Sequence, residues 1–307
     1  MRIVFMGTPD FAVPCLRMLA ESSHEVPAVF TQPDKPKGRG YKMIPTPVKS
    51  AAMEYDIPVY QPLSLRKGDD AVQSVEILKS ISPDLIVVTA YGQILPKEIL
   101  DLPKYGCINI HASLLPAYRG AAPINWCILN GEKITGVTSM MMAEGLDTGD
   151  MLVKKSTEIG ENETYQELYS RLAAMGGDVL VETVQAIENG TLSREKQDDT
   201  LSSYSPMIRK EMSALDFSES VQKIHNTIRG VTGFTTLNGK RLKIFKSEIV
   251  AGNSGAENGT IVNTDDFTVK CGNGLIRFCE IQLEGSKRMK TADFLRGRKL
   301  ISGEKLG

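Results

Sequence analysis

Asn109, His111 and Asp147 are the residues of this chain whose types and spacing could do chemistry. Asn109 and His111 are two positions apart around the end of an apolar run at 107–110, so on a strand both side chains point to the same face. A second strand-like run, 136–143, leads into the turn G-L-D-T-G-D at 145–150, which could return the Asp147 carboxylate to the imidazole. An amide, an imidazole and a carboxylate can perform acyl-group chemistry without a nucleophile from the protein.

The other two histidines are weaker candidates. His24 lies in the polar stretch S-S-H-E, which is typical of a surface turn, and His225 lies on an expected helix, where packing or surface exposure is usual. A single histidine at a strand end is also more often structural than catalytic. The setting of His111, with Asn109, the L-L-P segment and the G-L-D turn, favours a catalytic role.

Motifs for other chemistries are absent from the sequence. The first apolar run is followed by G-T-P-D rather than G-x-G-x-x-G, and neither a phosphate-binding G-x-x-x-x-G-K-[ST] loop nor a G-x-S-x-G elbow occurs. Three histidines and five scattered cysteines without a C-x-x-C pair argue against a metal site and fit a reducing, cytoplasmic compartment. No apolar run is long enough to span a membrane, and the start M-R-I-V-F-M-G leaves no room for a signal peptide.

The first 190 residues alternate strand-like and helical patterns. Strands are expected at 3–6, 26–31, 85–90, 107–110 and 136–143, and helices at 10–20, 48–55, 123–129 and 163–188. This alternation predicts an α/β fold with a doubly wound, mostly parallel, Rossmann-like sheet. Ligands of such sheets bind at the carboxyl ends of the strands, where Asn109 and His111 are expected.

The pattern changes after a polar stretch at 190–207. One expected helix, 218–228, precedes short strand-like runs at 234–237, 242–249, 260–262, 268–271 and 275–283, with hairpin turns at Asn238-Gly239 and at 272–274. Short strands at this spacing predict a small C-terminal β-barrel of the oligonucleotide-binding (OB) type. We therefore expect a catalytic domain at 1–189, a linker at 190–207 and an OB-like domain at 208–307.

Charge is distributed unevenly along the chain. Residues 208–307 hold 17 Lys/Arg and 11 Asp/Glu, whereas 1–207 carry a net charge of −7. A basic C-terminal domain fits a polyanionic partner such as a nucleic acid, although an ordinary solvated surface explains the same numbers. The Gly/Pro-rich loop after the second strand adds Lys35, Lys37, Arg39 and Lys42, which could clamp an anionic backbone at the rim of the crevice.

Five segments together resemble the methionyl-tRNA formyltransferases, over nearly the whole chain. They are F-M-G-T-P-D-F near the start, Q-P-D-K-P-K-G-R-G at 32–40, Y-G-Q-I-L-P at 91–96, N-I-H-A-S-L-L-P-A-Y-R-G-A-A-P-I at 109–124 and G-L-D-T-G-D at 145–150. The last two segments contain the pattern N-x-H…S-L-L-P…D. This pattern is shared by the wider group of enzymes that use 10-formyltetrahydrofolate, including glycinamide ribonucleotide formyltransferase. The opening segment, the basic loop and the basic barrel point to the tRNA member.

The resemblance implies roles for individual residues. Asn109, His111 and Asp147 match the catalytic trio, and Arg39 matches a loop arginine used on the tRNA acceptor end. The residues that match folate-contacting segments are Ser113, Leu114, Leu115, Pro116, Tyr91, Gly92, Ile94 and Leu95. The second domain departs from the family, because I-R-G-V-T-G-F-T-T at 228–236 stands where an Asn-Pro-Trp-Pro-like segment is usual. This departure affects the contacts of the barrel rather than the chemistry.

The expected reaction moves a formyl group from 10-formyltetrahydrofolate to the α-amine of initiator methionyl-tRNA for translation initiation. The Asn109 amide and a protonated His111 would donate hydrogen bonds to the oxyanion, and Asp147 would hold the imidazolium and help remove the amine proton. The protein would act as a cytoplasmic monomer of the bacterial type, without a metal. Two alternatives remain: a formyltransferase for a small-molecule amine, and an RNA-binding protein without enzymatic activity, for which the trio would be unnecessary.

Overall fold

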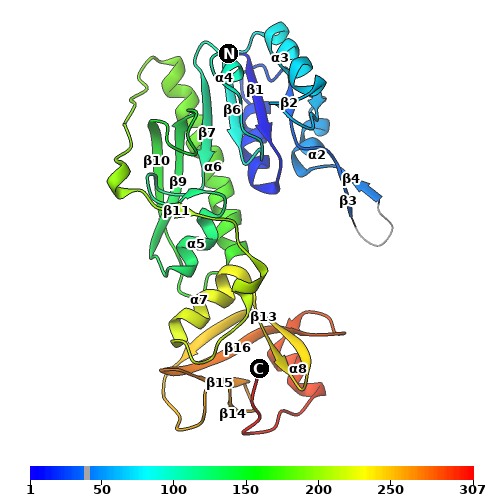
Figure 1. The fold of residues 1–307 in the computed structure, drawn as a ribbon, viewed down its shortest axis with the longest axis vertical. Helices are drawn as coiled ribbons and strands as arrows, with labels where there is room; N and C mark the ends of the chain where they lie inside the picture. Colours follow the sequence, from blue (N-terminus) through cyan, green and yellow to red (C-terminus); the bar gives the residue numbers. More distant parts are fainter. Residues whose placement is uncertain (38–41) are drawn as a thin grey trace. The chain divides into compact units, whose positions relative to one another are not determined.

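The chain forms two compact units in a computed structural model that describes residues 1–37 and 42–307 (Figure 1). Unit 1 comprises Met1–Gly120, Thr135–Thr157 and Tyr169–Tyr204, and unit 2 comprises Ala121–Ile134, Glu158–Leu168 and Ser205–Gly307. The division therefore does not follow a single cut along the chain, because two short segments from before residue 190 belong to unit 2. Unit 1 also includes most of the stretch that we expected to be a linker.

Unit 1 is built on a sheet with the strand order β10-β9-β7-β6-β1-β2-β5. The strands are β1 (Ile3–Gly7), β2 (Val29–Phe30), β5 (Val59–Tyr60), β6 (Leu85–Thr89), β7 (Cys107–His111), β9 (Ile134–Met141) and β10 (Met151–Glu158). Strands β7, β6, β1, β2 and β5 pair in parallel, and β9 is antiparallel to β7. The predicted mostly parallel sheet is confirmed.

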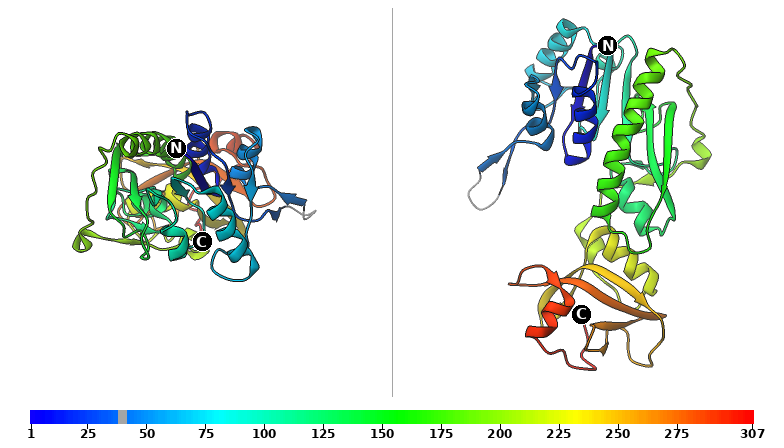
Figure 2. Two further views of the ribbon diagram at one scale, coloured as in Figure 1. Left: turned by 90° about the horizontal axis from the view of Figure 1, so that it is seen from above. Right: turned by 180° about the vertical axis from the view of Figure 1, so that it is seen from behind.

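Helices cover both faces of this sheet. They are η1 (Asp10–Ala12), α1 (Val13–Ala20), α2 (Pro47–Glu54), α3 (Asp69–Ile81), α4 (Lys97–Leu100) and α6 (Tyr165–Glu188). On one face α6 packs closely on β7 and α1, since a Cβ at Gly176 would lie 3.3 Å from Ile110 and 3.6 Å from Cys15. On the other face Leu78 of α3 and Ile99 of α4 share a core cluster with alternate residues of β1 and β6. Figure 2, seen from behind, shows α6 lying along the first of these faces.

The remaining elements of unit 1 are short. Strands β3 (Lys35–Lys37) and β4 (Lys42–Ile44) form an antiparallel pair where we expected only a loop. Two more strands, β8 (Arg119–Gly120) and β11 (Tyr204–Ser205), and the 3₁₀ helix η2 (Asp199–Leu201) lie in segments of irregular backbone. The backbone N–H of Arg119 donates to the Ser203 carbonyl at 2.8 Å, so the expected linker lies against β8.

Unit 2 is an antiparallel sheet with the order β12-β13-β16-β15-β14, and β17 pairs with β16. Its elements are α5 (Pro123–Leu129), η3 (Lys210–Ser213), α7 (Val221–Val231), β12 (Gly233–Leu237), β13 (Lys240–Val250), β14 (Ile261–Asn263), β15 (Thr268–Cys271), β16 (Gly274–Leu283), β17 (Met289–Lys290) and α8 (Thr291–Gly297). Asn238 and Gly239 have φ values of 51° and 70°, as a tight hairpin turn requires.

The last residues of the chain connect the two ends of this sheet. The Ile261 N–H of β14 donates to the Glu304 carbonyl at 2.8 Å, and the Gly307 N–H donates to the Thr236 carbonyl of β12 at 3.3 Å. One apolar cluster fills the interior, including Phe267, Phe278 and Ile281. The antiparallel C-terminal fold predicted from the short strands is confirmed.

Candidate active site

His111 is the last residue of β7, and both of its ring nitrogens face oxygen atoms of the protein. Nε2 lies 2.9 Å from the Tyr118 carbonyl oxygen, and Nδ1 lies 3.6 Å from Asp147 Oδ2. A carbonyl oxygen can only accept, so Nε2 carries a hydrogen and donates it. Nδ1 is therefore the nitrogen that can exchange a proton, and it faces a carboxylate at slightly more than hydrogen-bond distance.

Asp147 reaches this histidine because the loop between β9 and β10 folds back along β7. The register pairs His111 with Thr138 and Ile108 with Met141, so β9 ends beside the start of β7. Gly149 passes against the end of β9, where a Cβ would lie 1.8 Å from the Met141 carbonyl oxygen. Asp147 itself has a φ of 53°, a left-handed conformation that Asp tolerates better than most residues.

A backbone N–H also holds the Asp147 side chain. The Gly120 N–H donates to Oδ2 at 2.8 Å, and this is the same oxygen that faces His111. The side chains of His111 and Asp147 are only 6% and 11% exposed, so their interaction takes place largely away from water. A shielded carboxylate and imidazole at this distance can pass a proton directly or through one water molecule.

Asn109 precedes His111 by two positions on β7, between Val88 of β6 and Met140 of β9. It is half-buried on a strand whose other residues are buried. Within the described part of the chain, the Asn109 amide has no hydrogen-bond partner, whereas both ring nitrogens of His111 face protein oxygens. Asn109 is therefore the member of the trio that can offer an uncommitted donor to a substrate oxygen.

The two segments that match folate contacts follow neighbouring parallel strands. Tyr91–Leu95 come just after β6, and Ser113–Pro116 come just after β7, so both lie at the carboxyl edge of the sheet. Thr138 ties the second segment down, because its hydroxyl donates to the Ser113 carbonyl at 2.7 Å and accepts from the Leu115 N–H at 3.2 Å.

Individual side chains in these segments differ in exposure. Ser113, Leu115, Tyr91 and Leu95 are buried, Leu114 and Pro116 are half-buried, and Ile94 is 64% exposed. Gly92 has a φ of 84° and lets the backbone turn between Tyr91 and Ile94. Burial raises the pKa of Tyr91, so its hydroxyl keeps its proton. Within the described residues, this buried hydroxyl and Gln32 Nε2 are polar atoms without a partner.

The basic loop is described only in part. Lys35 is exposed on β3, Lys37 and Lys42 pair across the β3–β4 ladder, and Arg39 lies outside the described residues.

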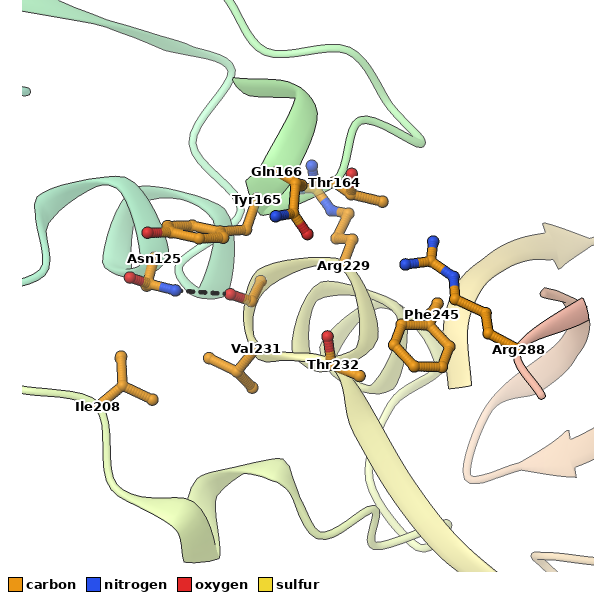
Figure 3. A pocket seen from close by; sticks show the side chains of 11 residues that line it. Asn125, Thr164, Tyr165, Gln166, Ile208, Arg229, Val231, Thr232, Phe245 and Arg288 are labelled. Atoms are coloured by element: carbon orange, nitrogen blue, oxygen red, sulfur yellow. Dashed lines mark hydrogen bonds between the residues drawn. The ribbon is translucent and has the colours of Figure 1, made fainter. Parts of the chain in front are cut away.

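Unit 2 contains two cavities, and neither is lined by Asn109, His111 or Asp147. The first has a volume of about 320 Å³ and lies around the end of α7 (Figure 3). Arg288 lies over the Phe245 ring at 4.1 Å beside this cavity, and the buried Arg229 donates to the Asn226 side chain and to backbone carbonyls. The second cavity, of about 410 Å³, is lined by Lys210, Arg241 and Lys243 and shares Val231 and Thr232 with the first.

Three of the five cysteines are unsuited to act as nucleophiles. Burial raises the pKa of Cys15, Cys107 and Cys271 to about 12, which keeps these thiols protonated at neutral pH. Among the residues that the structure describes, no group of three or more His, Cys, Asp or Glu side chains is placed to hold a metal ion. No described helix is both long and apolar enough to cross a membrane.

Sequence reasoning missed three residues that contact the catalytic trio. Tyr118 and Gly120 belong to the A-Y-R-G part of the motif at 109–124, but the sequence predicted no role for either residue. Gln197 donates to the carbonyls of Asp147 and Gly149, but it lies in the stretch that looked like a linker. No local pattern marks a single buried amide in such a polar segment.

Family models and curated relatives agree over both units. A family described as "Formyl transferase" matches residues 1–184, and "Formyl transferase, C-terminal domain" matches residues 207–299. The chain is 52% identical to the methionyl-tRNA formyltransferase of Geobacter sulfurreducens, covering 100% of this chain and 97% of the relative. It is 48% identical to the methionyl-tRNA formyltransferase of Ruminiclostridium cellulolyticum, with 100% of both covered.

Solved structures share the fold at lower identity. A sugar 3N-formyl transferase, solved in the presence of dTDP and 5-N-formyl-THF, has a TM-score of 0.68 at 22% identity, covering 94% of this chain and 99% of that chain. Glycinamide ribonucleotide transformylase 1 from Symbiobacterium toebii has a TM-score of 0.53 at 18% identity and covers 64% of this chain and 94% of that chain.

Proposed function

The chain belongs to the methionyl-tRNA formyltransferase family, and we propose that it transfers the formyl group of 10-formyltetrahydrofolate to the α-amine of methionyl-tRNA. The observation that carries the catalytic part is the His111–Asp147 pair, 3.6 Å apart and shielded from water, two positions along β7 from Asn109. As a translation enzyme it would act in the cytoplasm. The proposed division of labour puts catalysis in 1–189 and tRNA binding in 208–307.

The donor would lie against the two segments that follow β6 and β7. Residues at the carboxyl edge of a parallel sheet are where ligands of this fold bind. A polar ligand could supply hydrogen-bond partners for the Tyr91 hydroxyl and Gln32 Nε2, which are buried and have none within the described residues. The formyl donor supplies an electrophilic carbon at this site when it is bound.

Asn109 would stabilise the charge that develops on the formyl oxygen. Its amide has two N–H groups and no partner within the described residues, so it can donate without breaking another bond. His111 has less freedom than we expected from the sequence, since Nε2 is committed to Tyr118. Any hydrogen bond from His111 to the oxyanion would therefore come from Nδ1.

Asp147 and Nδ1 of His111 would manage the proton of the attacking amine. The carboxylate can take this proton directly or through water, and a proton on Nδ1 gives an imidazolium that the same carboxylate stabilises. The Gly120 N–H keeps Oδ2 pointed at the ring while this happens. No covalent intermediate with the protein is needed.

The acceptor would be recognised by positively charged side chains that take no part in the chemistry. Lys35, Lys37, Arg39 and Lys42 on the loop after β2, together with Lys210, Arg241 and Lys243 around the second cavity of unit 2, are suited to phosphate contacts. The stacked pair of Arg288 and Phe245 in Figure 3 is also the type of surface on which a nucleotide base can stack.

A formyltransferase for a small-molecule amine is the second candidate, because the fold is shared with a sugar formyl transferase and with glycinamide ribonucleotide transformylase. The test is to supply the purified chain with 10-formyltetrahydrofolate labelled in the formyl group and to follow the label. We expect label on methionyl-tRNA and none on aminosugar nucleotides or glycinamide ribonucleotide. Transfer to a small amine in preference to methionyl-tRNA would overturn the proposal.

A further inference from the structure

Gln197 is an isolated buried side chain in a polar segment. Within residues 193–204, all of which the structure describes, every other residue is exposed, while Gln197 is 6% exposed. Burying an amide costs free energy unless its hydrogen bonds are completed, so the contacts of Gln197 show what stabilises it.

The Gln197 amide nitrogen binds both ends of the catalytic turn. Nε2 donates to the Asp147 carbonyl at 2.8 Å and to the Gly149 carbonyl at 2.7 Å, which uses both of its hydrogens. Asp147 stands at a φ of 53° between two exposed neighbours, Leu146 and Thr148. Together with the Gly120 N–H on the Asp147 carboxylate and the close packing of Gly149 on Met141, these two hydrogen bonds constrain the backbone that carries the carboxylate.

The Gln197 side-chain oxygen connects this turn to β8. Oε1 accepts from Arg119 Nε at 2.9 Å, and Arg119 Nη2 forms a 2.8 Å ion pair with Asp199. The residues on either side of Arg119 are the ones that touch the trio: Tyr118 through its carbonyl to His111, and Gly120 through its N–H to Asp147. Gln197 therefore links the backbone of Asp147 to the segment that orients both His111 and the Asp147 carboxylate.

Backbone pairing holds the same segment on both sides of Gln197. Glu195 and Met151 exchange two backbone hydrogen bonds, at 2.8 and 2.9 Å. On the other side, the Ser203 carbonyl accepts from the Arg119 N–H, and the Ser203 hydroxyl accepts from the Tyr118 N–H, both at 2.8 Å. The segment thus spans from the start of β10 to β8, and Gln197 lies between these two anchors.

We propose that Gln197 is a positioning residue for the reaction, which acts by holding the Asp147 turn and Arg119 so that the carboxylate and His111 Nδ1 keep their alignment. This inference rests on the proposed function, since it assigns Asp147 and His111 to catalysis. It predicts that losing the Gln197 hydrogen bonds lowers kcat rather than donor affinity. A displacement of about 1 Å at reacting groups can cost about 100-fold in rate.

The test compares Gln197→Met, which keeps the side-chain length but removes the hydrogen bonds, with Asp198→Asn. Asp198 is the exposed neighbour, and its carboxylate bonds only locally with Thr200, so this substitution is the matched control. Formyl transfer to methionyl-tRNA and the thermal midpoint are measured for both variants. We expect kcat to fall about 10- to 100-fold in Gln197→Met, with donor KM and the control variant close to wild type.

A double-mutant cycle separates positioning from a general structural role. If Gln197 acts through Asp147, Gln197→Met should lower kcat far less in an Asp147→Asn background than in the wild type. Equal losses in both backgrounds, or wild-type kcat in folded Gln197→Met, would overturn the inference. If Gln197→Met does not fold, Gln197→Glu replaces it, because a carboxylate still accepts from Arg119 but cannot donate to the two carbonyls.

The outcome is distinguishable from failure of the proposed function. Wild-type protein that formylates a small amine instead of methionyl-tRNA would contradict the proposed acceptor, and the same comparison would then be made with that amine. Wild-type activity on methionyl-tRNA together with unaffected Gln197→Met would contradict only the role of Gln197.

Discussion

At the scale of residues, the catalytic site depends on how three side chains share their hydrogen-bonding atoms. His111 commits Nε2 to the Tyr118 carbonyl, which leaves Nδ1 for Asp147, and the Asn109 amide is left for the substrate. The residue types and the two-residue spacing predicted that Asn109 and His111 would share a strand. Which ring nitrogen faces Asp147 could not be predicted. It depends on the Tyr118 carbonyl, which takes Nε2, and the sequence does not reveal the left-handed backbone of Tyr118, with a φ of 61°.

His111→Ala should lower kcat for formyl transfer by about 100-fold or more, because it removes the group that exchanges a proton with Asp147. Donor affinity should stay nearly unchanged, since the proposed donor contacts come from other residues. Steady-state kinetics with a separate donor-binding measurement check this. Thr200→Ala, on the surface, is the control. His225→Ala is unsuitable because that histidine is buried. Turnover of His111→Ala close to that of wild type would reject the assignment.

At the scale of elements, loops decide the site more than strands do. Strands β1, β6 and β7, helix α5 and the hairpins of unit 2 could be predicted from apolar periodicity and turn residues. Helix α3 was not predicted. Its buried face is limited to Ser74, Val75 and Leu78, and Val72 of the same helix is exposed. The stretch 190–207 looked like a linker because it is polar. The contacts of Gln197 could not be predicted, since its partners Asp147 and Arg119 lie 50 and 78 positions earlier in the chain.

Gly149→Ala should displace the catalytic turn, because the new Cβ would lie 1.8 Å from the Met141 carbonyl oxygen. The backbone must shift to relieve this overlap, so kcat should fall and the free energy of unfolding should drop by about 1–3 kcal/mol. Gly297→Ala is the control, since a Cβ there meets nothing within 4 Å. Denaturant unfolding and formyl transfer are measured for both. An unchanged Gly149→Ala enzyme would show that the turn is not tightly constrained.

His225 should make stability depend on pH. Burial lowers its pKa, and the charge of Arg229 lowers it further. The hydrogen bond to the Glu161 carbonyl and the negative charges of Glu161 and Glu248 raise the pKa, but by less. The neutral ring fits its partners, with Nε2 3.0 Å from the Glu161 carbonyl and Nδ1 2.9 Å from the Ser247 hydroxyl. Since the unfolded chain binds a proton more readily, stability should fall as pH decreases below about 6.5.

The measurement for His225 is the thermal midpoint between about pH 5 and 7. In His225→Gln the decline with acidification should be smaller than in wild type, even if that variant is less stable at every pH. Parallel pH profiles for the two proteins would assign the dependence to other groups.

At the scale of the whole molecule, the two units explain why removing residues 208–307 is a poor test of the C-terminal domain. Residues 121–134 and 158–168 belong to unit 2, where Asn125 donates to the Gly230 carbonyl and the Glu161 carbonyl faces His225. Truncation would leave these two segments without their core. Substitutions of surface charges test the same idea without unfolding the unit.

The double substitution Lys210→Gln and Lys243→Gln should raise the KM for methionyl-tRNA and reduce its dependence on salt concentration. Each lost phosphate contact should lower the slope of log affinity against log salt by about 1. Both residues are exposed and line the second cavity of unit 2, and the exposed Lys299 provides the control substitution Lys299→Gln. The KM of the formyl donor should not change. Identical salt slopes for all three proteins would remove this surface from the tRNA-binding site.

Asp147→Asn is the decisive variant for the proposed reaction, because one measurement involves the donor, the acceptor and the catalytic site together. Asn tolerates the left-handed backbone at this position, so the change removes charge with little change of shape. The measurement is the single-turnover rate of formyl transfer from saturating 10-formyltetrahydrofolate to methionyl-tRNA, with the thermal midpoint as a control. We expect the rate to fall by about 100-fold or more in a folded protein with unchanged donor affinity. Transfer at the wild-type rate by folded Asp147→Asn would contradict the catalytic role of Asp147.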